Sequence, residues 1–112
     1  MKIDILTLFP HMLEGFLNES IIKRSINKNL VEINLINFRK YSKLNNSQVD
    51  DTPYGGGAGM VLRCEPIFEC LDTIRTPDST VILVTPDGQT YNQKMAQELK
   101  LKKHLIIICG HY

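Results

Sequence analysis

Two short apolar segments, residues 80–84 and 105–109, place the strongest constraint on how this chain folds. Each contains β-branched residues and is too short for a helix, which favours a strand that is buried on both faces. Between them lies a helical pattern that begins with a capping box formed by Thr90 and Gln93. Two buried strands joined through a helix are typical of neighbouring parallel strands, so the pattern predicts an α/β fold.

The rest of the chain alternates between strands and helices in the same way. A helix is predicted from Pro10, a second after a break and a new N-cap at residues 18–20, and a third from Glu65 and Pro66. Asn27 and Asn29 are suited to end the second helix, because Asn tolerates the left-handed conformation. The predicted fold is a mostly parallel sheet flanked by helices, with strands near residues 2–8, 30–36, 80–85 and 105–109.

The composition is that of one compact domain. The 112 residues carry a formal net charge of +1 and 43 % of them are hydrophobic, which excludes a disordered chain and a multidomain protein. The longest apolar run is far shorter than the ~20 residues of a membrane helix, and the first residues lack the pattern of a signal peptide. The three cysteines form no C-x-x-C pair and the histidines show no metal-ligand spacing. We therefore expect a cytoplasmic protein with no membrane contact and no metal site.

A glycine cluster at residues 55–59 is the first candidate for a functional segment. It is neither a Walker A loop nor a dinucleotide-binding fingerprint, because the residues that follow those motifs are missing. Glycines allow close backbone approach to a ligand, although a flexible hinge would have the same composition. The preceding residues Asp50, Asp51 and Tyr54 favour a nucleobase as the ligand. Carboxylates can hydrogen-bond to a base, and an aromatic ring can stack on it.

The ends of the two apolar strands are the second candidate. Residues 84–88 and 109–112 place small or rigid residues directly after each strand. Backbone groups beside apolar side chains suit an adenine ring, although residues 86–88 also fit a simple tight turn. Among the basic residues, Arg39 and Lys40 are the most suggestive of phosphate contact. We find no nucleophile–base–acid arrangement in the sequence that indicates a catalytic site.

Three segments together resemble a known family. Residues 3–10, the Asp-Asp-x-Pro-Tyr-Gly-Gly-Gly-x-Gly-Met string at residues 50–60, and the ending at residues 108–112 are similar to bacterial tRNA (guanine-N1)-methyltransferases of the SPOUT class. The resemblance extends over the whole chain. It implies a homodimer with a trefoil knot that uses S-adenosylmethionine to methylate, on tRNA, the guanosine 3′ of the anticodon.

The resemblance also implies residue roles. The methyl donor is expected against Leu83, Val84, Thr85, Pro86, Gly110 and Tyr112. The target guanine is expected near Asp50, Tyr54, Gly55, Gly56, Gly57 and Gly59. Phe16 and Ile22 are expected at a subunit contact. Members of the family continue past the Gly-x-Tyr motif, so residues 1–112 are expected to be the N-terminal part of the methyltransferase domain, without the completed knot, the catalytic base or the C-terminal tRNA-binding domain.

Two alternatives from other classes stay open. The first is a non-catalytic half-domain that binds a nucleotide or dimerises without turnover. The second is a small flavodoxin-like or nucleotide-dependent oxidoreductase. The second is disfavoured, because residues 8–11, at the first strand–helix junction, form no Gly-rich or Ser/Thr-rich phosphate loop. Whether the chain is such a half-domain or the N-terminal part of the methyltransferase, it is expected to transfer no methyl group on its own.

Overall fold

The computed structural model describes residues 1–41, 50–51, 61–62, 64–85 and 87–109. Four parallel strands form its main sheet in the order β2-β1-β6-β5, with bounds β1 (Lys2–Thr7), β2 (Glu32–Ile36), β5 (Ser79–Leu83) and β6 (His104–Cys109). In the register, Lys2 of β1 lies opposite both Glu32 and His104. The predicted parallel α/β fold is confirmed, and the four strands lie where the apolar segments indicated.

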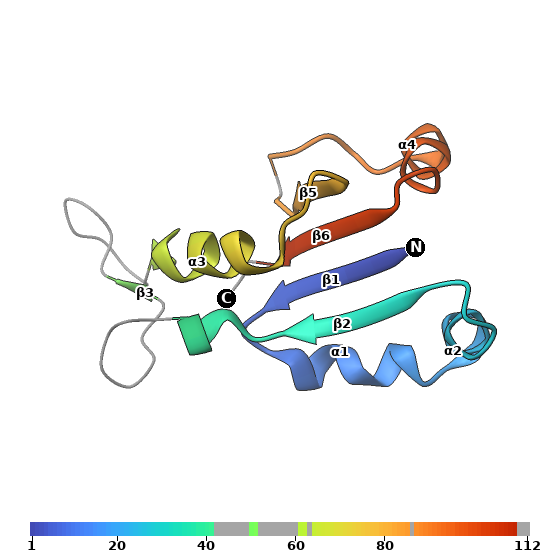
Figure 1. Cartoon of the computed structure of the whole chain (residues 1–112), viewed down its shortest axis with the longest axis horizontal. Coiled ribbons are helices and arrows are strands. Elements are labelled where there is room, and N and C mark those ends of the chain that lie inside the picture. Colours follow the sequence, from blue (N-terminus) through green and yellow to red (C-terminus); the bar gives the residue numbers. More distant parts are fainter. Residues whose placement is uncertain (42–49, 52–60, 63, 86, 110–112) are drawn as a thin grey trace.

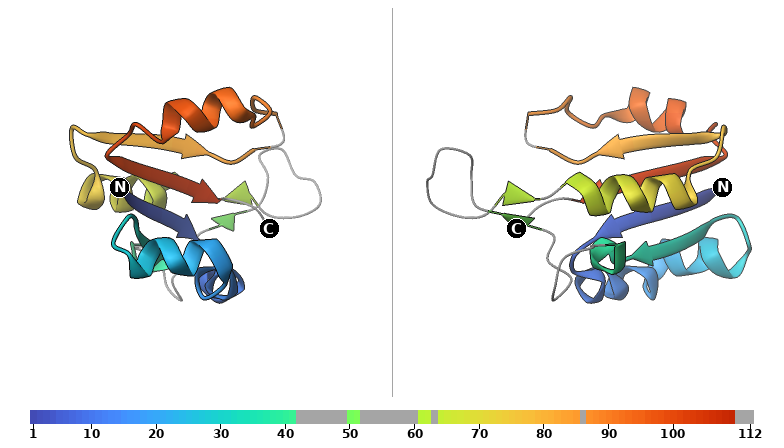
Figure 2. Two further views of the ribbon diagram at one scale, coloured as in Figure 1. Left: turned by 90° about the vertical axis from the view of Figure 1, so that its right-hand side faces the viewer. Right: turned by 60° about the vertical axis from the view of Figure 1, so that its left-hand side comes forward.

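Helices cover both faces of the sheet (Figures 1 and 2). On one face lie α3 (Cys64–Ile74) and the short 3-10 helix η1 (Phe38–Tyr41), and on the other lie α1 (Pro10–Leu17), α2 (Ser20–Asn27) and α4 (Gln93–Leu99). This division follows from right-handed crossovers between parallel strands. In the part of the chain that the structure describes, no helix has the length and apolar character needed to cross a membrane.

The core lies between the two central strands and α3. Alternate residues of β1 and β6 point to this face, because side chains of a strand alternate between the two sides of a sheet. They pack against η1 and α3 in one cluster of buried residues: Leu6, Leu8, Phe38, Cys70, Leu71, Ile106 and Ile108. Phe38 is fully buried, so the 3-10 helix that follows β2 is fixed to the core by its first side chain.

The strand β5 departs from the sequence prediction. We expected it to be buried on both faces, but Val81 is 39 % exposed and Leu83 is 61 % exposed. The reason is its position, since β5 is the edge strand beside β6 while α3 covers the central strands. An apolar β-branched segment therefore predicted a strand correctly without revealing its place in the sheet.

The helix ends confirm two predictions and correct one. Asn29, just beyond α2, has a φ of +58°, which agrees with an Asn in the left-handed conformation. The break and new N-cap predicted at residues 18–20 are confirmed, with Glu19 at the N-cap, although its side chain makes no capping hydrogen bond. The capping box was wrong, because α4 is capped by Asn92, whose Oδ1 accepts a 3.0 Å hydrogen bond from the Met95 N–H.

A short antiparallel ribbon joins β3 (Asp50–Asp51) to β4 (Val61–Leu62), with Asp50 opposite Leu62. No alternation of apolar and polar residues in the sequence indicates this ribbon. The ribbon lies beyond the carboxyl ends of the main strands, on the same side as η1 and the start of α3 (Figure 1). Residues 42–59 carry glycines and polar residues without an apolar anchor, which predicts a mobile or irregular segment, and most of them lie outside the described residues.

Candidate functional site at the carboxyl ends of the strands

A cavity of about 690 Å³ opens where β5 ends, between the sheet and α4. Its floor comes from the ends of β5 and β6, and its walls come from residues 85–91 and one side of α4. The lining residues are Ile82, Leu83, Val84, Thr85, Gly88, Gln89, Thr90, Tyr91, Met95, Leu99 and Ile107. In open α/β sheets ligands bind at this edge, outside the carboxyl ends of parallel strands.

The backbone at the mouth of the cavity is held by short-range hydrogen bonds. The Val84 N–H donates to the Ile108 carbonyl at 3.1 Å, which extends the pairing of β5 with β6 by one residue. The chain then turns, with the Gly88 N–H donating to the Thr85 carbonyl at 3.4 Å and the Asp87 N–H to the Thr85 Oγ1 at 3.3 Å. The tight turn expected here is therefore present, and it forms one rim of the cavity.

Gly88 has little space for a side chain in this turn. A Cβ at Gly88 would lie 3.1 Å from the Thr85 methyl group and 3.6 Å from its carbonyl oxygen. A side chain here would push the rim against Thr85. The position therefore favours glycine, which lets the backbone approach a bound molecule closely.

A second cavity of about 430 Å³ continues the first along α4 toward Met1. The two cavities share Ile82, Tyr91, Leu99 and Ile107. Tyr91 is 66 % exposed, so this residue, which the two cavities share, is largely accessible to solvent. The combined surface is apolar with a few polar groups at one end, a lining suited to a flat ring that needs apolar contact on its faces and hydrogen bonds at its edge.

Three of the six residues expected at the methyl donor lie together in this cavity. Leu83, Val84 and Thr85 line it, while Pro86, Gly110 and Tyr112 lie outside the described residues. Tyr91 and Met95 line the same cavity but were not predicted as site residues. The helical spacing of Met95 and Leu99 indicates that both residues lie on the same side of α4. Together with the strand order, this would have placed both residues above the end of β5.

The residues expected at the guanine are only partly described. Asp50 begins β3, at the same edge of the main sheet as the cavity. Tyr54, Gly55, Gly56, Gly57 and Gly59 lie outside the described residues.

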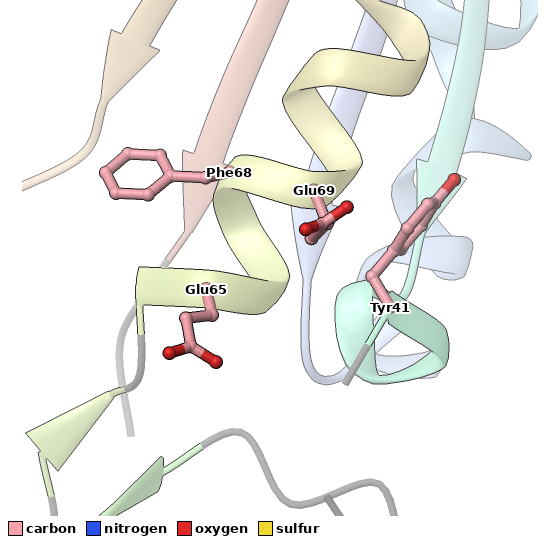
Figure 3. A pocket seen from close by; sticks show the side chains of 4 residues that line it. All are labelled: Tyr41, Glu65, Phe68 and Glu69. Carbon is pink, nitrogen blue, oxygen red and sulfur yellow. The ribbon is translucent and has the colours of Figure 1, made fainter. Parts of the chain in front are cut away.

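A smaller pocket of about 330 Å³ lies on the other face of the sheet, between η1 and α3. Tyr41, Glu65, Phe68 and Glu69 line it, and Figure 3 shows Tyr41 across from Glu69 while Phe68 points to the far side of α3. The Lys40 ammonium lies 5.3 Å from the centre of the Tyr41 ring. The sequence did not predict this pocket, because its residues come from segments on either side of the glycine cluster.

Cys109 is the last residue of β6. Burial raises the pKa of the Cys109 thiol above its ordinary value, and burial likewise raises the pKa of Cys70 in α3. Both thiols are therefore favoured in their neutral, weakly nucleophilic form. Among the described residues, no group of three His, Cys, Asp or Glu side chains lies close enough to hold a metal ion.

The fold and the cavity define an α/β protein with a cavity at the carboxyl edge of a parallel sheet, where open α/β sheets bind their ligands. Comparison with known proteins is more specific. A family model described as tRNA (Guanine-1)-methyltransferase TrmD matches residues 1–112. The chain belongs to this tRNA (guanine-1)-methyltransferase family, and membership implies a methyl donor.

Individual relatives agree with the family match. A tRNA (guanine-N(1)-)-methyltransferase of Malacoplasma penetrans is 53 % identical over 112 residues, which are all of this chain and 50 % of that protein. The enzyme of the same name from Staphylococcus epidermidis is 53 % identical over 113 residues, covering 46 % of its length. The crystal structure of tRNA (m1G37) methyltransferase from Aquifex aeolicus superposes with a TM-score of 0.84 at 37 % identity, covering 99 % of this chain and 51 % of that one. The chain thus spans about half the length of the relatives it matches.

Proposed function

We propose that this chain forms the donor-binding edge of an S-adenosylmethionine-dependent tRNA (guanine-N1)-methyltransferase. The observation that carries the proposal is the cavity at Leu83, Val84 and Thr85, which lies at the ligand-binding edge of a chain that the family model matches from residue 1 to residue 112. On this proposal residues 1–112 are the N-terminal part of the methyltransferase domain.

The residues present fit the donor in size and polarity. A cavity of about 690 Å³ lies within the ~300–1,000 Å³ typical of small-molecule sites. Leu83, Val84 and Met95 offer apolar contact to an adenine ring and a methionine chain, and the backbone groups of the Thr85 turn offer hydrogen bonds at the ring edge. Pro86, Gly110 and Tyr112 complete this wall on the proposal.

The proposed task of the described residues is to bind and orient. When bound, S-adenosylmethionine supplies a methyl group on a sulfonium, which an acceptor nitrogen can displace in line. The strand ends position the donor against the acceptor, and the apolar lining excludes water from the reacting atoms. N1 of guanine carries a proton at neutral pH, so a base is needed as well. We assign no catalytic base to this chain and expect it beyond Tyr112.

The proposed guanine contacts come from the segment that contains the ribbon. Asp50, Tyr54 and the glycines at positions 55, 56, 57 and 59 hold the extruded base on this proposal, because a carboxylate can accept from its Watson–Crick edge and glycines allow close backbone approach. Arg39 and Lys40, on the half-exposed 3-10 helix at the same edge of the sheet, are suited to contact tRNA phosphates. We propose a cytoplasmic location on the same ground, because tRNA is the substrate.

We also propose that the protein acts as a homodimer. The first two helices leave apolar side chains uncovered, with Met12 80 %, Phe16 40 % and Ile21 70 % exposed. Phe16 belongs to this uncovered surface, which supports a subunit contact there, while Ile22 is half-buried. Concentration-dependent light scattering tests this directly, and a monomer at every concentration would contradict it.

The proposed function is tested by joining this chain to the other half of a relative. The chain replaces the corresponding half of the Malacoplasma penetrans enzyme, and transfer of a radiolabelled methyl group to unmodified tRNA is measured. We expect methylation at guanine N1 by the fusion protein and none by the chain alone. A folded fusion that binds tRNA but never binds S-adenosylmethionine would contradict the donor assignment, and turnover by the chain alone would contradict our placement of the base.

Two variants of the fusion separate the donor site from the guanine site. Gly110→Val is expected to abolish donor binding, because the branched side chain would occupy space where the backbone must approach the ligand. Asp50→Ala is expected to weaken methyl transfer while leaving the affinity for the donor unchanged. Isothermal titration with S-adenosylmethionine distinguishes the two, and equal effects of both variants on donor affinity would contradict the assignment.

A further inference from the structure

At the amino-terminal end of the sheet, opposite the proposed donor edge, four polar side chains form a chain of hydrogen bonds across all four strands. The His104 Nε2 lies 2.6 Å from the Asp4 Oδ2, and the His104 Nδ1 lies 2.6 Å from the Ser79 Oγ. The Asn34 amide donates to the other oxygen of Asp4 at 2.9 Å. Asp4 is 2 % exposed and His104 is 6 % exposed, so this cluster is part of the interior.

One arrangement of protons satisfies the donors and acceptors of the cluster. An ionised Asp4 only accepts, so its contact requires a proton on the His104 Nε2. In the neutral tautomer the Nδ1 then accepts, and the Ser79 hydroxyl donates to it. The Ser79 Oγ in turn accepts from the Thr76 N–H at 2.9 Å and lies 3.2 Å from the Thr76 Oγ1, which can donate to it as well. This arrangement runs in one direction, from Ser79 through His104 to Asp4.

We propose that Ser79 is an activated hydroxyl, a site of covalent modification by small activated acyl or phosphonyl compounds. His104 is the base that accepts its proton, and Asp4 is the positioning residue that fixes the tautomer and orientation of the imidazole. A hydroxyl, a ring nitrogen and a carboxylate in series within hydrogen-bond distance are the arrangement that activates serine nucleophiles on unrelated folds. In this cluster the Nδ1 of His104 faces the serine and the Nε2 faces the carboxylate, which is the reverse of the usual arrangement.

The modification step balances without any further reactant. With an alkyl fluorophosphonate, an oxygen–phosphorus bond forms at the Ser79 Oγ while the phosphorus–fluorine bond breaks and fluoride leaves. The hydroxyl proton passes to the His104 Nδ1, and Asp4 stabilises the resulting imidazolium through Nε2–H. The proton is later released to solvent, which leaves a phosphonylated serine. Ser79 itself is half-buried, and the labelling experiment measures whether a small reagent reaches its oxygen.

The chain contains its own matched control in Ser25. Ser25 is also half-buried, but its hydroxyl donates to the Ile21 carbonyl at 2.9 Å on α2, where it has no base. The native chain is treated with an alkyl fluorophosphonate, digested and mapped by mass spectrometry. We expect Ser79 to be labelled about 100-fold faster than Ser25, the lower range of general-base catalysis, and the difference to disappear in urea.

Variants then assign the roles of the two partners. Asp4→Asn and His104→Gln are expected to reduce the labelling of Ser79 about tenfold or more relative to Ser25 in the same folded molecule. A purely structural role for Asp4 would leave this ratio unchanged. If a variant fails to fold, the ¹⁵N spectrum of the wild-type imidazole still decides, since the proposal requires the proton on Nε2. Equal labelling of Ser79 and Ser25 in the native chain, or a proton on Nδ1 alone, would overturn the proposal.

Discussion

The carboxylate of Asp4 and the imidazole of His104 meet at 2.6 Å between β1 and β6, with 3 % and 7 % of their side chains exposed. Removing Asp4 leaves the buried Nε2–H of His104 without its acceptor, which costs about 1–3 kcal/mol. Asp4→Ala is therefore expected to lower the free energy of unfolding by about that amount, measured by urea denaturation.

Glu32 provides the control for this experiment. It accepts from the same Asn34 amide at 3.3 Å but is exposed to solvent. Glu32→Ala is expected to change the free energy of unfolding by less than about 0.5 kcal/mol. If Asp4→Ala and Glu32→Ala lowered the free energy of unfolding by similar amounts, burial of the Asp4–His104 contact would not determine how much it stabilises the fold.

Two phenylalanines differ sharply in how much they stabilise the fold. Phe38 is fully buried between η1 and α3, while Phe68 on α3 is 60 % exposed. Phe38→Ala is expected to cost about 3–5 kcal/mol of unfolding free energy, because it removes a buried ring and leaves a cavity. Phe68→Ala is expected to cost less than about 1 kcal/mol, and denaturant titrations of both variants should show the difference.

Substitutions at two glycines distinguish an effect on the proposed donor cavity from an effect on overall stability. Gly88→Ala is expected to weaken binding of S-adenosylmethionine, because the new Cβ meets Thr85 at 3.1 Å on the cavity rim. Gly15 lies in α1 with open space around it. Gly15→Ala is therefore expected to leave donor affinity unchanged and to raise stability by about 0.5–1 kcal/mol. Isothermal titration and thermal unfolding measure the two effects. Unchanged affinity in a folded Gly88→Ala variant would contradict the proposed position of the donor.

Cys70 is expected to make stability depend on alkaline pH. Burial raises its pKa in the folded state above the ordinary value of 9.0, although the Tyr41 hydrogen bond and Lys40 act in the opposite direction. Above pH 9 the unfolded chain therefore loses this thiol proton before the folded protein does. The stabilising contribution of the neutral thiol is complete below pH 9 and is lost as the pH rises through the folded-state pKa.

The measurement is the slope of unfolding free energy against pH between pH 8 and 10. In Cys70→Ala the decline above pH 9 should be shallower than in the wild-type chain, because one group with a raised pKa is removed. Parallel slopes for the two proteins would mean that the Cys70 thiol ionises equally in the folded and unfolded states.

Much of the fold could be predicted from local patterns. The apolar segments at 80–84 and 105–109 and the alternation around residues 31–35 indicated strands, and the structure has β5, β6 and β2 there. The position of a strand in the sheet could not be predicted in the same way, because burial depends on which elements pack on each face. Val81 shows this, since its β-branched neighbourhood predicts an interior strand but the edge leaves it 39 % exposed.

The candidate site was predictable in part. The end of the apolar segment at residues 80–84 indicated a ligand site, and the resemblance implied Leu83, Val84 and Thr85, which the structure brings together in one cavity. Tyr91 and the chain of Ser79, His104 and Asp4 could not be predicted, because each depends on contacts between distant strands and helices. Isolated polar residues in a sequence carry no periodic signal, and only the strand order β2-β1-β6-β5 makes Asp4 and His104 neighbours.

The central pairing of β1 with β6 also sets the order in which the sheet can be completed. Asp4 and Ile106 lie opposite each other in register, and the Asp4–His104 contact spans 100 positions of sequence. A fold dominated by such non-local pairs has high contact order and folds slowly, because a long loop must close before the pairs form. During synthesis β1 can pair early only with β2, so its other edge stays open until β6 has left the ribosome. An unpaired edge of this kind is a site for aggregation, and the nascent chain depends on rapid addition of β6 to remove it.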